Sequence, residues 1–248
     1  MKKGIDVSKH NGNINWNKVN VDFAILRAGY GNSVSQKDAK FEANYAGAKK
    51  AGIPIGAYWY SYAKTEADAK KEAEACLAIL KGKQFEYPIY YDIEEKGSLA
   101  VANKIARVFC DILEKAGYYV GIYCSTSHLL TYFSDEIRRR YTIWVAQWRV
   151  SKPSYSGTYD IWQYSDSGRI NGISGNVDMD YCYLDFPSII KKVGLNGFSK
   201  TPTNTVKNDS YIVQAGDTLT SIAKKYDMTV DEIVAKNNLI KEGQKLIV

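Results

Sequence analysis

Two residue types that many hydrolases use are scarce in this 248-residue sequence. It holds only two histidines, His10 and His128, and four cysteines with no Cys-x-x-Cys spacing. A catalytic zinc site usually takes two or three histidines or a cysteine cluster, so the sequence predicts no metal and no other cofactor. Isolated cysteines are typical of reduced thiols in a protein that folds in a reducing compartment.

Long apolar runs are also missing. No stretch approaches 18 apolar residues, which predicts no membrane insertion. The segment Met1–Asp6 has two lysines but neither the apolar core nor the cleavage site of a signal peptide, so we expect synthesis in a cytoplasm. The net charge is +6, and the one dense basic run is Arg138–Arg140. We therefore expect no nucleic-acid partner; the sequence carries no signal for an oligomeric state.

Aromatic residues, in contrast, are abundant and unevenly placed. All five tryptophans and 18 of the 20 tyrosines precede residue 187. Tyr and Trp offer a flat apolar face with a polar edge, which suits the C–H face and hydroxyls of a sugar ring. Many of these side chains, taken singly, are explained by a hydrophobic core, but their excess indicates a carbohydrate-binding groove.

Short apolar runs alternate with helical patterns through residue 186. Alternation of this kind predicts a parallel sheet, and about eight strands in under 200 residues predict a closed, TIM-like α/β barrel. The connections at 148–159 and 164–176 have no helical period, so we expect an irregular barrel. The expected strands are Lys3–Val7, Phe23–Ala28, Ile55–Tyr60, Pro88–Ile93, Tyr119–Tyr123, Ile143–Gln147, Asp160–Gln163 and Val177–Tyr183. The expected helices are Asp38–Ala51, Thr65–Leu80, Leu99–Ala116 and a short one near Thr126–Phe133.

The C-terminal part has a different organisation. Residues 193–210 are polar and aperiodic, which predicts a linker after a first domain of residues 1–192. Residues 211–248 then predict a small strand–helix–helix–strand domain. Its strands are expected at Tyr211–Val213 and Lys245–Val248, and Thr229 and Glu232 have the spacing of a capping box.

Acidic residues stand at the ends of three expected strands. Asp92 and Glu94 are two apart after a buried run, so on a strand their side chains would share one face at the barrel mouth. Two nearby carboxylates shift each other's pKa, as glycoside hydrolysis requires of its acid and its carboxylate. A solvated loop or a metal-binding pair would also explain this spacing. Asp6 and Asp178 join that rim only if the last strand runs antiparallel to the first; otherwise each is an ordinary turn residue.

These residues lie in motifs that resemble a known family. Residues 4–183 are similar to the family 25 glycoside hydrolases, the Chalaropsis-type lysozymes found among phage endolysins. The motifs that carry the resemblance are Gly4–Ser8, Phe23–Ala28, Gly56–Tyr60, Tyr91–Glu94, Gly121–Ser125, Trp144–Gln147, Ile161–Tyr164 and Val177–Asp180. Residues 211–248 resemble a LysM module, through Tyr211–Leu219, Ile222-Ala223 and Asn237–Leu239.

The resemblance implies a fold, a substrate and an activity. The fold would be a barrel of five β/α units and three further strands followed by a βααβ LysM domain. The activity would be hydrolysis of the β-1,4 bond between N-acetylmuramic acid and N-acetylglucosamine in bacterial cell-wall peptidoglycan, by an enzyme that reaches the wall after release from the host cytoplasm. A non-catalytic wall-binding protein and a chitinase-like glycosidase are the alternatives.

The resemblance also implies roles for individual residues. Glu94 would be the general acid/base, and Asp92 either the nucleophile or the group that orients the substrate's N-acetyl group. Asp6 and Asp178 would complete the acidic rim. Asp180 stands where the family usually has Asn, and its role stays open. Expected sugar-binding residues, each of which could instead belong to the core, are Tyr58, Tyr60, Tyr123, Trp144, Trp162 and Gln163.

Overall fold

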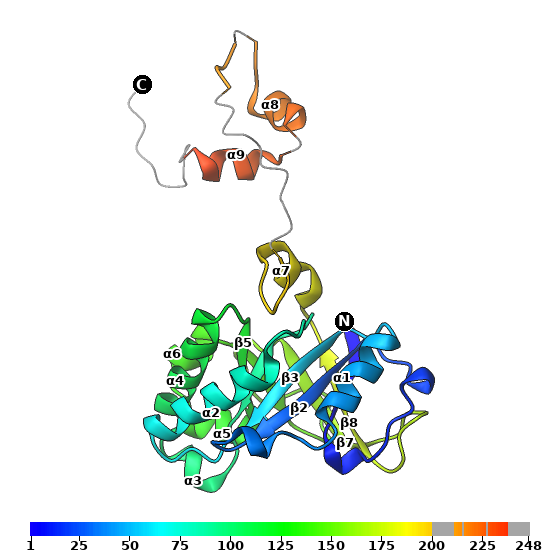
Figure 1. The fold of residues 1–248 in the computed structure, drawn as a ribbon. Helices are drawn as coiled ribbons and strands as arrows, with labels where there is room; N and C mark the ends of the chain where they lie inside the picture. Colours follow the sequence, from blue (N-terminus) through cyan, green and yellow to red (C-terminus); the bar gives the residue numbers. More distant parts are fainter. Residues whose placement is uncertain (200–210, 215, 227, 238–248) are drawn as a thin grey trace. The chain divides into compact units, whose positions relative to one another are not determined.

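The computed structural model describes residues 1–199, 211–214, 216–226 and 228–237. The chain divides into two compact units, Met1–Thr201 and Pro202–Val248. Figure 1 shows the first unit as a barrel of strands with helices packed around it.

The first unit is a closed barrel in which eight strands follow one another in sequence order. Strands β1 to β7 pair in parallel, and β8 is antiparallel to both β7 and β1. The expected irregular α/β barrel is confirmed. The strands are β1 Lys2–Val7, β2 Phe23–Tyr30, β3 Ile55–Tyr60, β4 Ile89–Asp92, β5 Val120–Ser125, β6 Thr142–Ala146, β7 Ile161–Gly168 and β8 Val177–Cys182.

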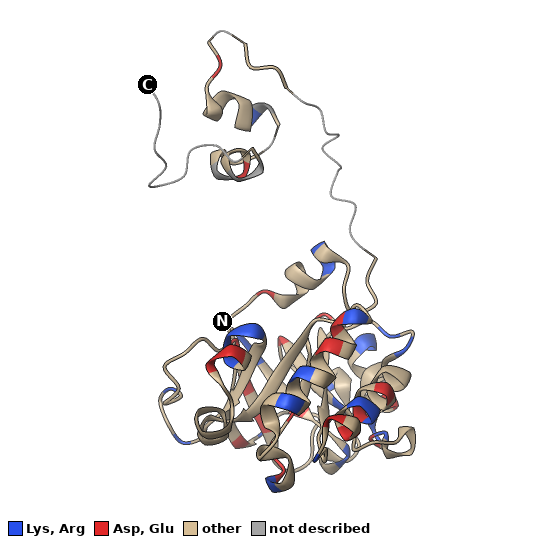
Figure 2. Ribbon diagram, turned by 90° about the vertical axis from the view of Figure 1, so that its left-hand side faces the viewer, with Lys and Arg blue, Asp and Glu red and all other residues tan. Residues whose placement is uncertain are grey.

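Helices connect the early strands and cover the outside of the barrel. Strands β2 to β6 are buried on both faces along most of their length, as in other parallel sheets, because helices lie against their outer side. The helices carry basic and acidic residues interspersed (Figure 2). They are α1 Phe41–Lys50, α2 Glu66–Leu80, α3 Lys96–Leu99, α4 Ala102–Lys115, α5 Thr126–Tyr132, α6 Asp135–Arg140 and α7 Phe186–Val193, with 3₁₀ helices η1 Lys9–Asn11, η2 Trp16–Lys18 and η3 Val34–Gln36.

The structure differs from the expected elements in three connections between strands and in the segment after β8. Only the 3₁₀ helices η1 and η2 lie between β1 and β2, so the first β/α unit has no α-helix. The expected helix Leu99–Ala116 is divided into α3 and α4. The sequence prediction also missed α6 and α7. The connections β6–β7 and β7–β8 hold no helix, as expected.

Aromatic side chains fill the barrel interior in layers. Near the N-terminal ends of the strands, Phe23 stacks on Tyr87 at 4.5 Å between ring centroids. Helix α7 covers this opening, because Phe186 lies 5.7 Å from both Tyr87 and Tyr119. The N-terminal end of the barrel is therefore closed, and the opposite end is left for a site.

The segment after α7 remains part of the barrel. Gly194 ends α7 in the left-handed conformation, and Asn196 is fully buried. The side chain of Asn196 donates to the carbonyl oxygens of Phe85 and Tyr87 and accepts from the backbone of Tyr119. The expected linker start at residue 193 is therefore wrong, because these hydrogen bonds hold residues 193–198 on the barrel. Residues 200–210 of the expected linker lie outside the described residues.

The second unit contains two short helices, α8 Leu219–Lys225 and α9 Val230–Lys236. Each begins at a threonine capping box, Thr218 with Ser221 and Thr229 with Glu232. Residues 211–214 have no regular secondary structure, so the expected strand Tyr211–Val213 is absent from the described residues; the expected strand Lys245–Val248 lies outside them. Across the described part of the chain, no helix is both long and apolar enough to span a bilayer.

Candidate active site

A cavity of about 380 Å³ opens at the C-terminal ends of the parallel strands. This is the end where barrel enzymes carry their catalytic groups. Each of the eight strands contributes at least one side chain to its lining. The lining residues are Asp6, Ser8, His10, Asn11, Arg27, Tyr58, Tyr60, Asp92, Glu94, Tyr123, Trp144, Trp148, Gln163, Asp166, Asn176 and Asp178.

All four acidic residues expected at the site line this one cavity. Asp92 is the last residue of β4, and Glu94 follows it by two. Strand β8 runs antiparallel to β1, and their register places Asp178 directly opposite Asp6. Because the last strand runs antiparallel to the first, Asp6 and Asp178 lie on the same rim as Asp92 and Glu94.

Asp92 and Glu94, the two acids at the end of β4, differ in how deeply they are buried. Asp92 is 3% exposed and its Oδ1 atom has no hydrogen-bond partner in the protein, whereas Glu94 is partly exposed. Burial and the charge of Glu94 raise the pKa of Asp92, which Arg27 opposes. Burial and the charges of Asp178 and Glu95 raise the pKa of Glu94. A raised pKa lets Glu94 hold a proton at a higher pH than a free glutamate, as a general acid must.

Asp6 and Asp178 form the opposite side of the rim. Asp6 is 5% exposed and accepts a hydrogen bond of 2.7 Å from Nε2 of Gln163. The Oε1 atom of Gln163 accepts from Tyr123 Oη and from Trp148 Nε1, each at 3.0 Å. Gln163 is thereby held in one orientation by three partners. Burial and the charge of Asp166 raise the pKa of Asp178 to about 6.

Aromatic residues form the floor and one wall of the cavity. Trp144 is almost fully buried and contacts the rings of Tyr58, Tyr90 and Tyr123 at centroid distances of 6.0, 5.2 and 4.4 Å. It therefore supports the site from below. Tyr60 is more exposed and lies 5.1 Å from Tyr62, so its ring offers a surface at the mouth.

Trp162 is the one expected site residue that the structure does not bring to the cavity. Its ring packs with Tyr164 and Tyr181, and its Nε1 donates to the carbonyl oxygen of Gln147. Neighbouring residues on a strand point to opposite faces, so with Gln163 facing inward Trp162 must face outward. Of the two neighbours, the structure therefore brings only Gln163 to the cavity.

Sequence reasoning missed several lining residues, of which Arg27 and Trp148 are the most informative. Arg27 is held by an ion pair of 2.7 Å between its Nε and Asp38, and its Nη2 atom is buried without a partner. A charged residue inside the otherwise apolar run Phe23–Ala28 was the available signal. Trp148 follows β6 and is 41% exposed; nothing in its sequence context distinguished it.

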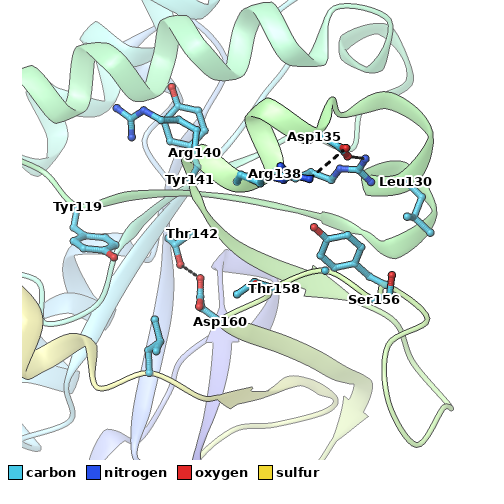
Figure 3. Close-up of a pocket in the computed structure, with 14 residues that line it drawn as sticks. Tyr119, Leu130, Asp135, Arg138, Arg140, Tyr141, Thr142, Ser156, Thr158 and Asp160 are labelled. Atoms are coloured by element: carbon cyan, nitrogen blue, oxygen red, sulfur yellow. Dashed lines mark hydrogen bonds and ion pairs between the residues drawn. The ribbon is translucent and has the colours of Figure 1, made fainter. Parts of the chain in front are cut away.

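A second cavity, of about 700 Å³, lies at the N-terminal end of β6 (Figure 3). Its lining includes Arg138, Arg139 and Arg140, but each lies within ion-pair distance of an acid, Asp135 for the first two and Glu114 for the third. Asp160 accepts from Thr142 across the same cavity. The charges of this cavity are therefore already paired, whereas the smaller cavity holds carboxyl groups whose pKa values are raised.

The described residues contain no group of three His, Cys, Asp or Glu side chains arranged as metal ligands. All four cysteines are unpaired and buried. The cavity itself is lined by the carboxyl groups of Asp6, Asp92, Glu94 and Asp178. A protonated glutamate and a carboxylate beside it can deliver a proton to a leaving oxygen and stabilise positive charge at carbon.

Comparisons with known proteins agree with this geometry. The family description "Glycosyl hydrolases family 25" matches residues 5–173, and "LysM domain" matches residues 211–248. The autolytic lysozyme of Clostridium acetobutylicum is 32% identical over 186 residues, which are 72% of this chain and 55% of that protein. This chain thus spans about half the length of that relative.

Solved structures show the same similarity. The CTP1L endolysin superimposes with a TM-score of 0.69 at 27% identity, covering 77% of this chain and 70% of that one. The modular autolysin LytC of Streptococcus pneumoniae, solved with a synthetic peptidoglycan ligand, gives a TM-score of 0.63 at 34% identity over 73% of this chain and 46% of that one.

Proposed function

Because the chain belongs to glycosyl hydrolase family 25 and carries a LysM domain, we propose that it hydrolyses bacterial cell-wall peptidoglycan. The bond cut is the β-1,4 linkage from N-acetylmuramic acid to N-acetylglucosamine. The observation that supports this most strongly is the convergence of Asp6, Asp92, Glu94 and Asp178 on one aromatic-lined cavity. The related LytC was solved with a synthetic peptidoglycan ligand, which supports the same substrate class.

Glu94 is the general acid/base. Its raised pKa favours the protonated form of the carboxyl relative to a free glutamate, and partial exposure places it where a leaving oxygen can reach it. Asp92 faces the developing positive charge with an oxygen that has no partner in the protein. That oxygen either attacks the anomeric carbon or accepts the N–H of the substrate's acetamide. Substrate lacking the acetyl group separates these two roles, since only the second needs it.

Asp6 and Asp178 place acidic groups on the opposite side of the rim. The side-chain amide of Gln163 lies next to Asp6 and donates a hydrogen bond to it. Tyr60 and Trp148 provide exposed aromatic surface for sugar rings. The LysM domain holds the enzyme on N-acetylglucosamine-containing chains of the same wall, so that cleavage and binding act on one polymer.

The test is release of reducing sugar from purified Gram-positive peptidoglycan, with Glu94→Gln as the matched variant and chitin as the second substrate. We expect the wild type to release ends that carry muramic acid, and Glu94→Gln to be at least about a hundredfold slower, as for loss of a general acid. Glucosamine at the new ends would make the protein a glucosaminidase. Wall binding without release would make it a binding protein, and faster cleavage of chitin would make it chitinase-like.

A further inference from the structure

Asp180 is a carboxyl group in the barrel interior that the proposed mechanism does not use. It lies on β8 two residues after Asp178, paired in register with Gly4 of β1 and Gln163 of β7. It is 0% exposed, and its Oδ1 atom accepts a hydrogen bond of 2.8 Å from Trp144 Nε1. Asp180 therefore sits beneath the rim, against the tryptophan that forms the floor.

Asp180 and Asp6 are diagonal neighbours on one face of the β1–β8 pair, because Asp6 is paired with Asp178 and Asp180 lies two residues further along β8. The Oδ2 atom of Asp180 is buried and has no donor while both carboxyl groups are ionised. The charge of Asp180 nevertheless acts on Asp6 and raises its pKa. A buried acceptor without a donor costs about 1–3 kcal/mol, and a second negative charge beside it adds repulsion. One proton between the two carboxyl groups removes both costs.

We propose that Asp180 and Asp6 share a single proton and that Asp180 is a positioning residue, which holds Asp6 toward the cavity. While the proton is present, it lies between Asp180 and Asp6, and Asp6 keeps its hydrogen bond from Gln163. When the proton leaves, two negative charges face each other in a dry interior and Asp6 loses its fixed position. The effect on catalysis rests on the proposed function; the shared proton does not.

The surrounding groups favour retention of this proton. Burial first and the charge of Asp178 next raise the pKa of Asp180, while its hydrogen bonds with Trp144 and Asp6 lower it. The pKa of Asp6 is raised by burial, by Asp180 and Asp178, and by Asp92 on β4.

The other ionisable groups near the pair are mostly neutral or acidic. They are Tyr58 on β3, Tyr123 on β5, Tyr164 on β7 and Cys182 on β8, each with a raised pKa. The cation that acts on this cluster is Arg27 on β2, which lowers the pKa values of Tyr58 and Asp92.

Asp180→Asn is the decisive variant because it preserves shape. The amide can still accept from Trp144, and its N–H can donate to Asp6 at every pH. The activity of the wild type should fall on the alkaline side as the proton leaves. That of Asp180→Asn should extend to higher pH, so that the ratio of kcat values rises by up to about tenfold per pH unit beyond the pKa of the pair. Glu66→Gln, which removes an exposed charge on α2, is the control. The pH dependence of its kcat should match that of the wild type.

Unfolding supplies a readout that does not need activity. All five tryptophans precede residue 187, so tryptophan fluorescence in urea reports on the barrel alone. A raised pKa means that stability is complete below the unfolded pKa and is lost as the pH rises through the folded pKa. Between about pH 4 and pH 9 the urea midpoint of Asp180→Asn should therefore increase relative to that of the wild type. A constant difference in midpoint would overturn the shared proton. A growing difference in a protein without hydrolase activity would support the pair while refuting the proposed function.

Discussion

Asp178 shows how a single acidic residue can serve the site at a cost to stability. Its pKa of about 6 lies above that of a free aspartate, because burial and Asp166 disfavour the charge. The stabilising effect of the raised pKa is complete below about pH 4 and is lost as the pH rises through about 6. At neutral pH the ionised Asp178 therefore destabilises the barrel.

Asp178→Asn should thus be more stable than the wild type at pH 7 to 8, by about 1–2 kcal/mol, and should lose most of this advantage near pH 4. Its hydrolysis of peptidoglycan should fall at least about tenfold, because the acidic rim loses a charge. Urea unfolding followed by tryptophan fluorescence, together with reducing-sugar release, measures both effects. A variant that is less stable than the wild type at pH 8 would contradict this account.

At the same scale, the site could be predicted from the sequence wherever the strand direction was known. The spacing of Asp92 and Glu94 was sufficient to place them together. Asp6 and Asp178 needed one further fact, the antiparallel direction of β8, which depends on long-range pairing and leaves no local signal. Trp162 and Gln163 were both expected at the site although neighbours on a strand face opposite ways; alternation alone would have separated them.

Helix α7 and the turn after it form an element that closes the end of the barrel opposite the site. Asn196 adopts a left-handed conformation with φ of 54° and makes three hydrogen bonds to the segments that precede β4 and β5. Replacement by alanine leaves the buried backbone groups that Asn196 pairs with unpaired. It also places alanine in a left-handed conformation, without the side-chain hydrogen bonds that stabilise asparagine there.

Asn196→Ala should therefore lower the free energy of unfolding by about 2–4 kcal/mol, while the folded protein keeps its kcat on peptidoglycan. Asn196→Gly is the matched control, since glycine tolerates the conformation but lacks the hydrogen bonds. The glycine variant should recover only the part of the loss that comes from the backbone, about 1 kcal/mol. If Asn196→Ala were as stable as the wild type, the turn would not hold α7 in place.

The sequence contains the residues that typically begin and end a helix at both ends of α7. Asp185 caps the helix through its side chain, Pro187 lies in the first turn, and Gly194 ends it with φ of 73°. The polar composition of residues 193–210 concealed the boundary, because one buried asparagine, not an apolar run, attaches the segment to the barrel. In the first connection, 3₁₀ helices replace an α-helix between β1 and β2, and periodicity cannot detect elements of three residues.

For the whole molecule, the fold class could be predicted because alternating strands and helices admit few closed arrangements. The hydrophobic core of the barrel is built without residues of the second unit. All residues of the two buried clusters that build the barrel precede residue 199, so the barrel does not need the second unit for its interior. The second unit matches the LysM description and, under the proposed function, supplies attachment to the wall.

A chain that ends at residue 199 should accordingly fold and hydrolyse small soluble wall fragments within about twofold of the full-length rate. On insoluble walls at low enzyme concentration it should be slower by about 10–100-fold, because it no longer gains the effective concentration that a tethered binding domain provides. The two rates should converge as enzyme is added until the walls are saturated.

The measurement is turbidity loss of purified walls beside product release from soluble fragments, with residues 211–248 added as a separate chain for the control. Addition in trans should restore nothing, since attachment acts only through a covalent link. An equal loss on soluble and insoluble substrates would instead show that the second unit contributes to the active barrel itself.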